Sequence, residues 1–345
     1  MLEPEFSSEP PLRPLLSIRN VVKEYKVGHD FPWSRPGIIH ALDGVSLDIK
    51  RGETIGLVGE SGCGKSTFAR VILLLDRPES GEVIFDGIDM LRSGHNDVVA
   101  YRRHVQMVFQ DPYSSLNPRV TVGEAIVRAW RINRGVVPVS EWRARAEELL
   151  ELVGLQPERF DWYPHQLSGG QRQRVAIARA LAVNPSLVVC DEPVSALDVS
   201  VQAQVIHLLR DLQVRLGVSY LFISHDLGVI RRIAQRVVVM YLGKVVEAGT
   251  VDDVFQRPAH PYTEALLSAI PTIDFTRGSK KARRLLQGDP PDPINVPTGC
   301  RFRTRCPKAA AVCAEQEPAL TPRDMPDHRT ACHFPNLYDD ATNGE

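Results

Sequence analysis

A glycine-rich stretch at residues 59–66 constrains the fold of this chain more than any other feature. It reads Gly-Glu-Ser-Gly-Cys-Gly-Lys-Ser and fits the pattern G-x-x-x-x-G-K-[ST] at every position. The apolar run Thr54–Val58 before it predicts a strand, and residues 66–70 after it predict the start of a helix. Glycines let backbone N–H groups curl around phosphate oxygens, and the helix N-terminus adds partial positive charge. The sequence therefore predicts a nucleotide phosphate loop between a strand and a helix.

Polar side chains at the end of this loop are suited to bind a nucleotide and its metal ion. Lys65 is expected to reach the terminal phosphates, and the Ser66 hydroxyl is expected to ligate Mg²⁺. We interpret Cys63 as a small filler residue rather than a redox group. The predicted loop residues are Gly59, Ser61, Gly62, Cys63, Gly64, Lys65, Ser66 and Thr67.

Two acids follow a second apolar run, residues 187–190. A buried strand would deliver both carboxylates to its C-terminal end, where α/β sheets bind ligands. Asp191 is placed to hold Mg²⁺, often through water. Glu192 is placed to orient or deprotonate an attacking water. With the phosphate loop upstream, the pair indicates nucleotide hydrolysis rather than the start of a solvated loop.

The apolar runs predict an α/β fold. Residues 187–190 and 220–223 are continuously apolar, as expected for strands of a parallel sheet that is covered on both faces. Between residues 110 and 191 the pattern is mostly helical, which predicts a helical subdomain of about residues 111–186 inserted in a core of residues 15–258. Residues 259–345 are richer in Pro, Cys and Arg, and we expect a separate C-terminal extension there.

The net charge and the N-terminal sequence limit the expected partners and cellular compartment of the chain. The net charge is −1, which argues against a nucleic-acid partner, since such proteins are normally basic. No apolar run approaches the ~18 residues of a membrane helix. Residues 1–14 are proline-rich and predict a flexible leader, without the charged start and apolar core of a secretory signal. We therefore expect a cytosolic chain with reduced cysteines.

The motif Leu167-Ser168-Gly169-Gly170-Gln171 precedes a predicted helix, ahead of the acidic pair. With it, the chain resembles the nucleotide-binding subunits of ABC transporters, whose signature is LSGGQ. Exposed N–H groups at this helix start would make a second anion site. The resemblance implies that this site faces the phosphate loop of a partner subunit, so that two ATP molecules are sandwiched between two subunits. The implied nucleotide contacts are Ser168, Gly169, Gly170 and Gln171.

Four further positions match motifs of the family one by one. Gln110 falls at the Q-loop, which senses Mg²⁺ and the attacking water, and Asp198 falls in the D-loop, which touches the opposite site. His225 matches the switch histidine, which hydrogen-bonds the γ-phosphate. Tyr25 lies where the family places an aromatic ring that stacks on adenine, with an ordinary core or surface tyrosine as the alternative. The resemblance thus implies ATP and Mg²⁺ as ligands, with Ser66, Gln110 and Asp191 at the metal.

Residues 109–118, 190–199 and 257–267 narrow the resemblance to the dipeptide and oligopeptide importer ATPases. The insertion at residues 28–40 is similar to the second of that system's two ATPases, the OppF/DppF type. The resemblance implies ATP hydrolysis that energises peptide import at the cytoplasmic face of the membrane. Implied partners are a paralogous ATP-binding subunit, two membrane-spanning permease subunits and, indirectly, an external solute-binding protein. Residues 113–127 are the expected docking surface for the permeases.

Other functions stay open at this stage. Nickel, glutathione or another small solute are alternative cargoes, since the cargo is chosen by subunits outside this chain. A soluble ABC ATPase is less favoured because such proteins usually carry two cassettes or a long coiled coil. A binding regulator without turnover is disfavoured by the presence of Glu192 and His225.

Four cysteines lie close together near the C-terminus. In a reducing compartment this clustering favours a metal site. Zinc sites prefer a closer first pair, and the wider spacings and the Cys-Pro step favour an iron–sulfur cluster, with zinc or free thiols as alternatives. The extension of the peptide importers resembles this pattern and implies a [4Fe–4S] cluster. Nearby Arg301, Arg303 and Arg305 are expected either to offset its charge or to form a solvated basic strand. The proposed ligands are Cys300, Cys306, Cys313 and Cys332.

Overall fold

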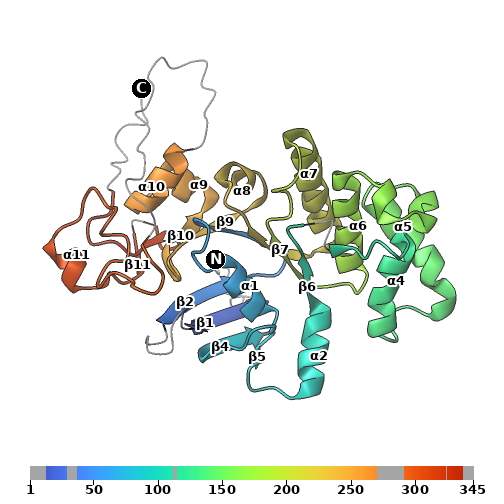
Figure 1. Cartoon of the computed structure of the whole chain (residues 1–345), viewed down its shortest axis with the longest axis horizontal. Helices are drawn as coiled ribbons and strands as arrows, with labels where there is room; N and C mark the ends of the chain where they lie inside the picture. Colours follow the sequence, from blue (N-terminus) through green and yellow to red (C-terminus); the bar gives the residue numbers. More distant parts are fainter. Residues whose placement is uncertain (1–12, 29–36, 112–114, 270–290, 324, 337–345) are drawn as a thin grey trace, which may run out of the picture.

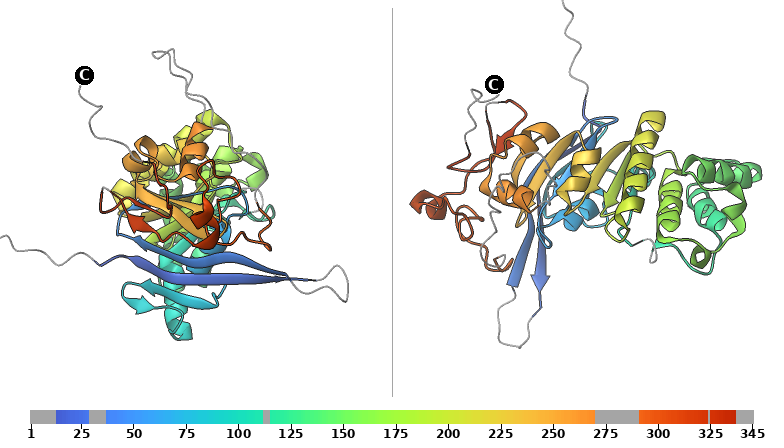
Figure 2. Two further views of the ribbon diagram at one scale, coloured as in Figure 1. Left: turned by 90° about the vertical axis from the view of Figure 1, so that its left-hand side faces the viewer. Right: turned by 90° about the horizontal axis from the view of Figure 1, so that it is seen from above.

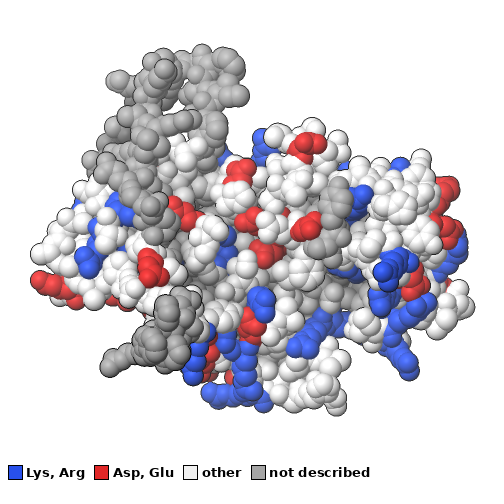
Figure 3. All heavy atoms as spheres, in the orientation of Figure 1, with Lys and Arg blue, Asp and Glu red and all other residues white. Residues whose placement is uncertain are grey.

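The computed structural model describes residues 13–28, 37–111, 115–269, 291–323 and 325–336 (Figure 1). Parts of the predicted segments therefore lie outside the described residues. These are most of the leader 1–14, the centre of the insertion 28–40, residues 112–114 of the helical subdomain, which include the first two residues of the docking surface 113–127, and residues 270–290, 324 and 337–345 of the extension 259–345. No helix in the described ranges combines the length and apolar character needed to cross a bilayer. Acidic and basic side chains are interspersed on the face drawn in Figure 3.

An eight-stranded sheet forms the centre of the molecule, in the order β11-β12-β10-β9-β3-β8-β7-β6. Neighbouring strands from β9 to β6 run parallel, and β3 and β8 are wholly buried. The prediction of a parallel sheet built on continuous apolar strands is thus confirmed. These strands are β3 (Thr54–Val58), β6 (Val105–Val108), β7 (Leu187–Asp191), β8 (Ser219–Ile223) and β9 (Arg236–Tyr241), and β10 (Lys244–Thr250) pairs antiparallel with β9.

A second, antiparallel sheet has the order β2-β1-β4-β5. Helix α1 (Lys65–Ile72) shares one buried cluster with both sheets, because Phe68 and Val71 are fully buried. This packing fixes the start of α1, and with it the phosphate loop, against the larger sheet. The strands are β1 (Leu16–Val27), β2 (Gly37–Ile49), β4 (Ser80–Phe85) and β5 (Ile88–Asp89), and α2 (His95–His104) follows them.

The chain between β6 and β7 forms helices at one end of the molecule, opposite the C-terminal segment (Figure 2). Trp130 is buried there, and its indole Nε1 donates to the carbonyl of Ala182 at 2.6 Å. The helices are α4 (Val122–Ile132), α5 (Trp142–Leu152) and α6 (Gly169–Leu181), with 3-10 turns at Val139–Glu141, Pro157–Asp161 and Pro164–Gln166. After β7 and β8 follow α7 (Val199–Leu216) and α8 (Leu227–Ile233).

The C-terminal segment shares its core with the nucleotide-binding part of the chain. Strand β12 (Arg329–Thr330) pairs with β10 and so extends the central sheet. Phe302 is 1% exposed and lies edge-on to Tyr241 of β9, with ring centroids 5.3 Å apart. Within the described residues, the expected extension therefore packs onto the sheet. Helix α9 (Val251–Gln256) follows β10, and the extension contains α10 (Pro261–Ser268), α11 (Ala311–Glu315) and β11 (Thr321–Pro322).

Candidate active site

The phosphate loop borders a cavity of about 720 Å³. Gly64 stands at the N-terminus of α1 with φ +105°, and a Cβ on it would lie 2.2 Å from the carbonyl oxygen of Ala41. A Cβ on Gly59 would lie 2.3 Å from the carbonyl oxygen of Met240. Both positions accept only glycine, so the neighbouring strands dictate how the loop curls. The loop residues that line the cavity are Ser61, Gly62, Gly64, Lys65, Ser66 and Thr67.

Lys65 is buried beneath the phosphate loop. Its Nζ donates to the carbonyls of Gly59 and Glu60, each at 2.8 Å, which places the charge below the curl of the backbone. Burial raises the pKa of the Cys63 thiol, so the thiolate needed for redox chemistry is disfavoured. Gly59 and Cys63 shape the loop and do not line the cavity.

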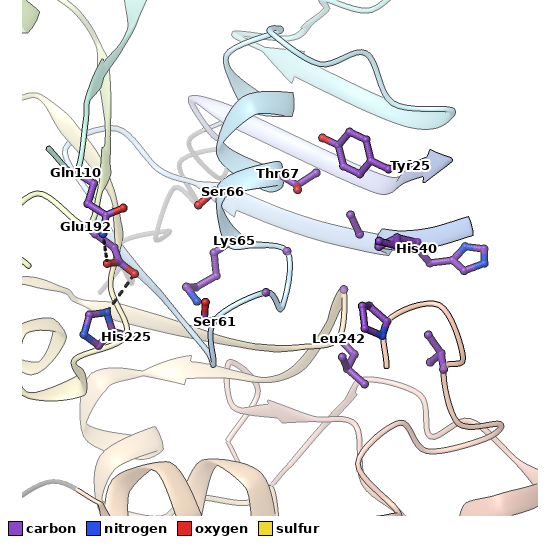
Figure 4. A pocket seen from close by; sticks show the side chains of 17 residues that line it. Tyr25, His40, Ser61, Lys65, Ser66, Thr67, Gln110, Glu192, His225 and Leu242 are labelled. Carbon is purple, nitrogen blue, oxygen red and sulfur yellow. Dashed lines mark hydrogen bonds and ion pairs between the residues drawn. The ribbon is translucent and has the colours of Figure 1, made fainter. Parts of the chain in front are cut away.

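The acidic strand end brings three predicted residues into contact (Figure 4). Glu192 accepts a hydrogen bond from Gln110 Nε2 at 3.0 Å, and its other carboxylate oxygen lies 3.1 Å from His225 Nδ1. The Glu192 N–H donates to the carbonyl of Ile223 at 3.0 Å, which ties the residue to the end of β8. The carboxylate is therefore held from both sides, at the edge of the cavity that the phosphate loop also borders.

Asp191 lies deeper than Glu192, at the last position of β7. Burial raises the pKa of Asp191 above its usual range, while a hydrogen bond with Ser66 opposes this shift. A hydroxyl and a carboxylate side by side are the oxygen donors that Mg²⁺ prefers. The residues present thus fit a magnesium ion, with Ser66 and Asp191 as its holders.

Tyr25 faces the cavity from β1, on the side opposite Glu192 (Figure 4). Its hydroxyl donates to Asp76 at 2.6 Å, and Asp76 accepts from Arg70 Nε at 2.8 Å, so the ring is anchored at its polar end. Sequence reasoning missed the apolar residues beside it, because they are distant in the chain and carry no motif. These are Ile39, Ala41, Leu242, Pro293 and Val296.

The signature residues lie apart from this cavity. Ser168 caps α6: its hydroxyl accepts from the Gln171 N–H at 3.3 Å, and the Gln171 side chain accepts from the Ser168 N–H at 3.0 Å. Sequence reasoning missed this capping box, which the S-x-x-Q spacing signals. A Cβ on Gly170 would lie 2.4 Å from Val201 Cγ1, so this glycine is required by packing. Neither residues 168–171 nor Asp198 lines the cavity of the same chain.

The structure does not confirm the predicted iron–sulfur site. Among the described residues, no group of three or more His, Cys, Asp or Glu side chains is arranged to hold a metal ion. Burial raises the pKa of the Cys332 thiol to about 11, and Cys306, Cys300 and Cys313 add smaller effects in the same direction. The Cys300 N–H donates to the carbonyl of Cys313 at 2.8 Å.

The contacts of the arginines beside the cysteines differ from both expected arrangements, charge compensation of a cluster and a solvated basic strand. Arg301 and Arg305 pair with acids of the nucleotide-binding part, Asp43 and Glu60, instead of facing solvent. Arg303 contacts Thr298 within its own segment.

Family models agree with this geometry. The model described as "ABC transporter" matches residues 42–195, which include the phosphate loop, Gln110, the signature and the acidic pair. The model described as "Oligopeptide/dipeptide transporter, C-terminal region" matches residues 246–313.

Several known proteins are similar over most of the chain. A putative peptide import ATP-binding protein of Brucella ovis is 48% identical over 325 residues, 94% of this chain and 99% of that protein. The oligopeptide transport ATP-binding protein OppF of Escherichia coli is 50% identical over 297 residues, 86% of this chain and 89% of that protein. A solved ATP-binding cassette, dimeric in a post-hydrolysis state with ADP and Pi, is 36% identical with a TM-score of 0.60, covering 68% of this chain and 98% of its own. The chain therefore belongs to the family of ABC transporter ATP-binding proteins that includes OppF, and it carries that family's ATPase fold.

Proposed function

We propose that the chain hydrolyses ATP to energise an importer of dipeptides or oligopeptides. The ATPase core is common to many transporters, so the observation that carries the peptide assignment is the match of residues 246–313 to the oligopeptide/dipeptide C-terminal region. The names of the similar proteins, which are peptide import and oligopeptide transport proteins, support the same cargo. Nickel, glutathione or another small solute are the alternatives that the test below separates.

The cavity suggests how each side chain takes part. The loop N–H groups and Lys65 bind the phosphates, and the Tyr25 ring is placed for the adenine. Ser66 and Asp191, with Gln110 nearby, would hold Mg²⁺, which neutralises phosphate charge when bound. Glu192 accepts the proton of the attacking water, while Gln110 and His225 hold its carboxylate in place.

We infer that a second, paralogous ATP-binding subunit completes this site. Two observations support the pairing: the signature residues do not line the cavity of their own chain, and the solved similar cassette is dimeric. Two permease subunits and, indirectly, an external solute-binding protein would complete the importer. The chain would then work at the cytoplasmic face of the membrane, with residues 113–127 against the permeases.

Reconstitution of the chain with its paralogue, both permeases and the solute-binding protein in proteoliposomes tests this function. We expect di- to pentapeptides to stimulate ATP hydrolysis and to be taken up, and nickel and glutathione to do neither. Ser168→Arg in this chain should abolish much of the stimulated hydrolysis, because a bulky cation at the helix cap would disturb the anion site offered to the partner. The isolated chain should bind ATP and hydrolyse it poorly.

Two outcomes would contradict the proposal. Stimulation by nickel or glutathione alone would assign another cargo. Full ATPase activity of a strictly monomeric preparation, verified by light scattering, would show that no partner subunit is needed.

We also propose that Cys300, Cys306, Cys313 and Cys332 hold a [4Fe–4S] cluster. The spacing of these cysteines and the backbone hydrogen bond between Cys300 and Cys313 support it, and the side chains would have to turn toward a common centre to bind. Anaerobically purified chain should contain roughly four irons and absorb near ~400 nm. Cys306→Ser should lose the iron, and Cys190→Ala, in β7, should keep it. Zinc in place of iron, or an absence of metal, would overturn the cluster.

A further inference from the structure

Arg305, which lies in the segment 300–332 that carries the four cysteines, forms an ion pair with the phosphate loop. Arg305 donates from Nη1 and Nη2 to the two carboxylate oxygens of Glu60, at 2.6 and 3.0 Å, in a two-pronged ion pair. The Arg305 side chain is only 5% exposed and that of Glu60 is 24% exposed. Glu60 is the second residue of the phosphate loop, although 245 positions separate the two residues in the chain. A pair with this geometry and burial is screened little by salt.

The backbone of Glu60 is held as firmly as its side chain. Its N–H donates to the hydroxyl of Tyr262 at 2.8 Å, and its carbonyl accepts from Lys65 Nζ at 2.8 Å. Tyr262 lies on α10 and is fully buried against Phe302, with ring centroids 5.4 Å apart. The start of the phosphate loop is therefore anchored by residues of the C-terminal segment and by the lysine that binds phosphate.

A second arginine of the same segment supports the other side of the loop. Arg301 donates to the carbonyl of Leu242 and to the carboxylate of Asp43. The next residue, Gly243, donates from its N–H to the carbonyl of Cys63 at 2.9 Å. Arg301 thus holds the β9–β10 turn that supports the loop at Cys63, while Arg305 holds the loop at Glu60.

The negative charge of Glu60 links its ion pair with Arg305 to nucleotide binding. A triphosphate is strongly anionic, and an uncompensated carboxylate in the loop would repel it. We propose that Arg305 is a positioning residue for ATP binding: it neutralises Glu60 and holds the loop in its curled form. The C-terminal segment thereby sets the affinity of the phosphate loop for ATP.

Binding of MgATP to the full chain, measured by titration calorimetry, tests the proposal. Arg305→Gln should weaken binding on the order of tenfold, because the Glu60 carboxylate is then left unpaired within the phosphate loop. Combining it with Glu60→Gln should restore part of the affinity, since the repulsion is removed while the contact that holds the loop stays lost. Arg303→Gln is the matched control and should bind as the unaltered chain does, because the Arg303 guanidinium hydrogen-bonds Thr298 of its own segment.

A purely structural role for Arg305 predicts a different pattern. Arg305→Gln would then lower the melting temperature without changing the affinity for ATP. Alternatively, the double variant would bind ATP as weakly as Arg305→Gln alone. Either result overturns the proposal. If Arg305→Gln does not fold, Arg305→Lys takes its place, because it keeps the charge and loses the two-pronged geometry. It should bind ATP measurably more weakly than the unaltered chain, and the assembled ATPase should show a raised KM with an unchanged kcat. An unaltered affinity of the lysine variant would also overturn the proposal.

Discussion

Replacement of Glu192 by Gln is expected to lower steady-state ATP hydrolysis on the order of 10²-fold or more, while MgATP binding stays near that of the unaltered chain. The amide keeps the size of the side chain and its hydrogen-bonding reach to Gln110, but it cannot accept a proton from water. The phosphates are bound elsewhere, by the loop and Lys65. Phosphate release by the reconstituted importer and titration calorimetry measure the two quantities.

The matched control for this variant is Glu148→Gln. Glu148 lies on α5, where its side chain is 59% exposed and pairs with Arg145. It should leave both quantities unchanged. A Glu192→Gln importer that hydrolyses ATP at the normal rate would remove Glu192 from the role of general base.

Replacement of Gly64 by Ala is expected to reduce ATP affinity on the order of 10²-fold. Alanine disfavours φ +105°, and its Cβ would meet the carbonyl oxygen of Ala41 at 2.2 Å, so the loop must open or β2 must move. Either movement displaces the N–H groups that surround the phosphates. Titration calorimetry with MgATP measures the loss, with circular dichroism to verify that the variant is folded.

Gly135→Ala separates backbone strain from damage to the site. Gly135 also has a positive φ, +84°, but it lies far along the chain from the phosphate loop and no atom would lie within 4 Å of an added Cβ. It should cost some stability and leave ATP affinity intact. Equal ATP affinities of the Gly64→Ala variant and the unaltered chain would show that the loop tolerates a side chain.

The catalytic residues could be predicted from the sequence because each follows a strand of the same parallel sheet. Glu192 directly follows β7, and Gln110 and His225 come two residues after the ends of β6 and β8, respectively. Parallel neighbouring strands end at the same edge, so short motifs that are distant in the chain converge there. The geometry of contact, with Glu192 between the other two, follows from the strand order β8-β7-β6.

Contacts that depend on tertiary packing could not be predicted in the same way. The pairing of β1 with β4 could not be predicted because Leu16 and its partner Phe85 lie far apart in the chain. The turn Asp86-Gly87 between β4 and β5, by contrast, is a hairpin signal that was overlooked. The Arg305–Glu60 ion pair could not be predicted for a similar reason. A run of arginines in the sequence does not show which acidic side chains the fold will place beside them. The function of Ser168 and Gln171 in capping α6 was readable, but the family motif drew attention to their N–H groups alone.

The pairing of β12 with β10 affects whether the C-terminal segment can be removed from this ATPase by truncation. A chain cut after residue 258 would leave β10 with an open hydrogen-bonding edge and would uncover Tyr241 and its neighbours. The C-terminal segment is therefore not an appendage that can be transplanted between ATPases of different transporters. We therefore expect a substitution that loosens the segment to lower the stability of the ATP-binding core as well.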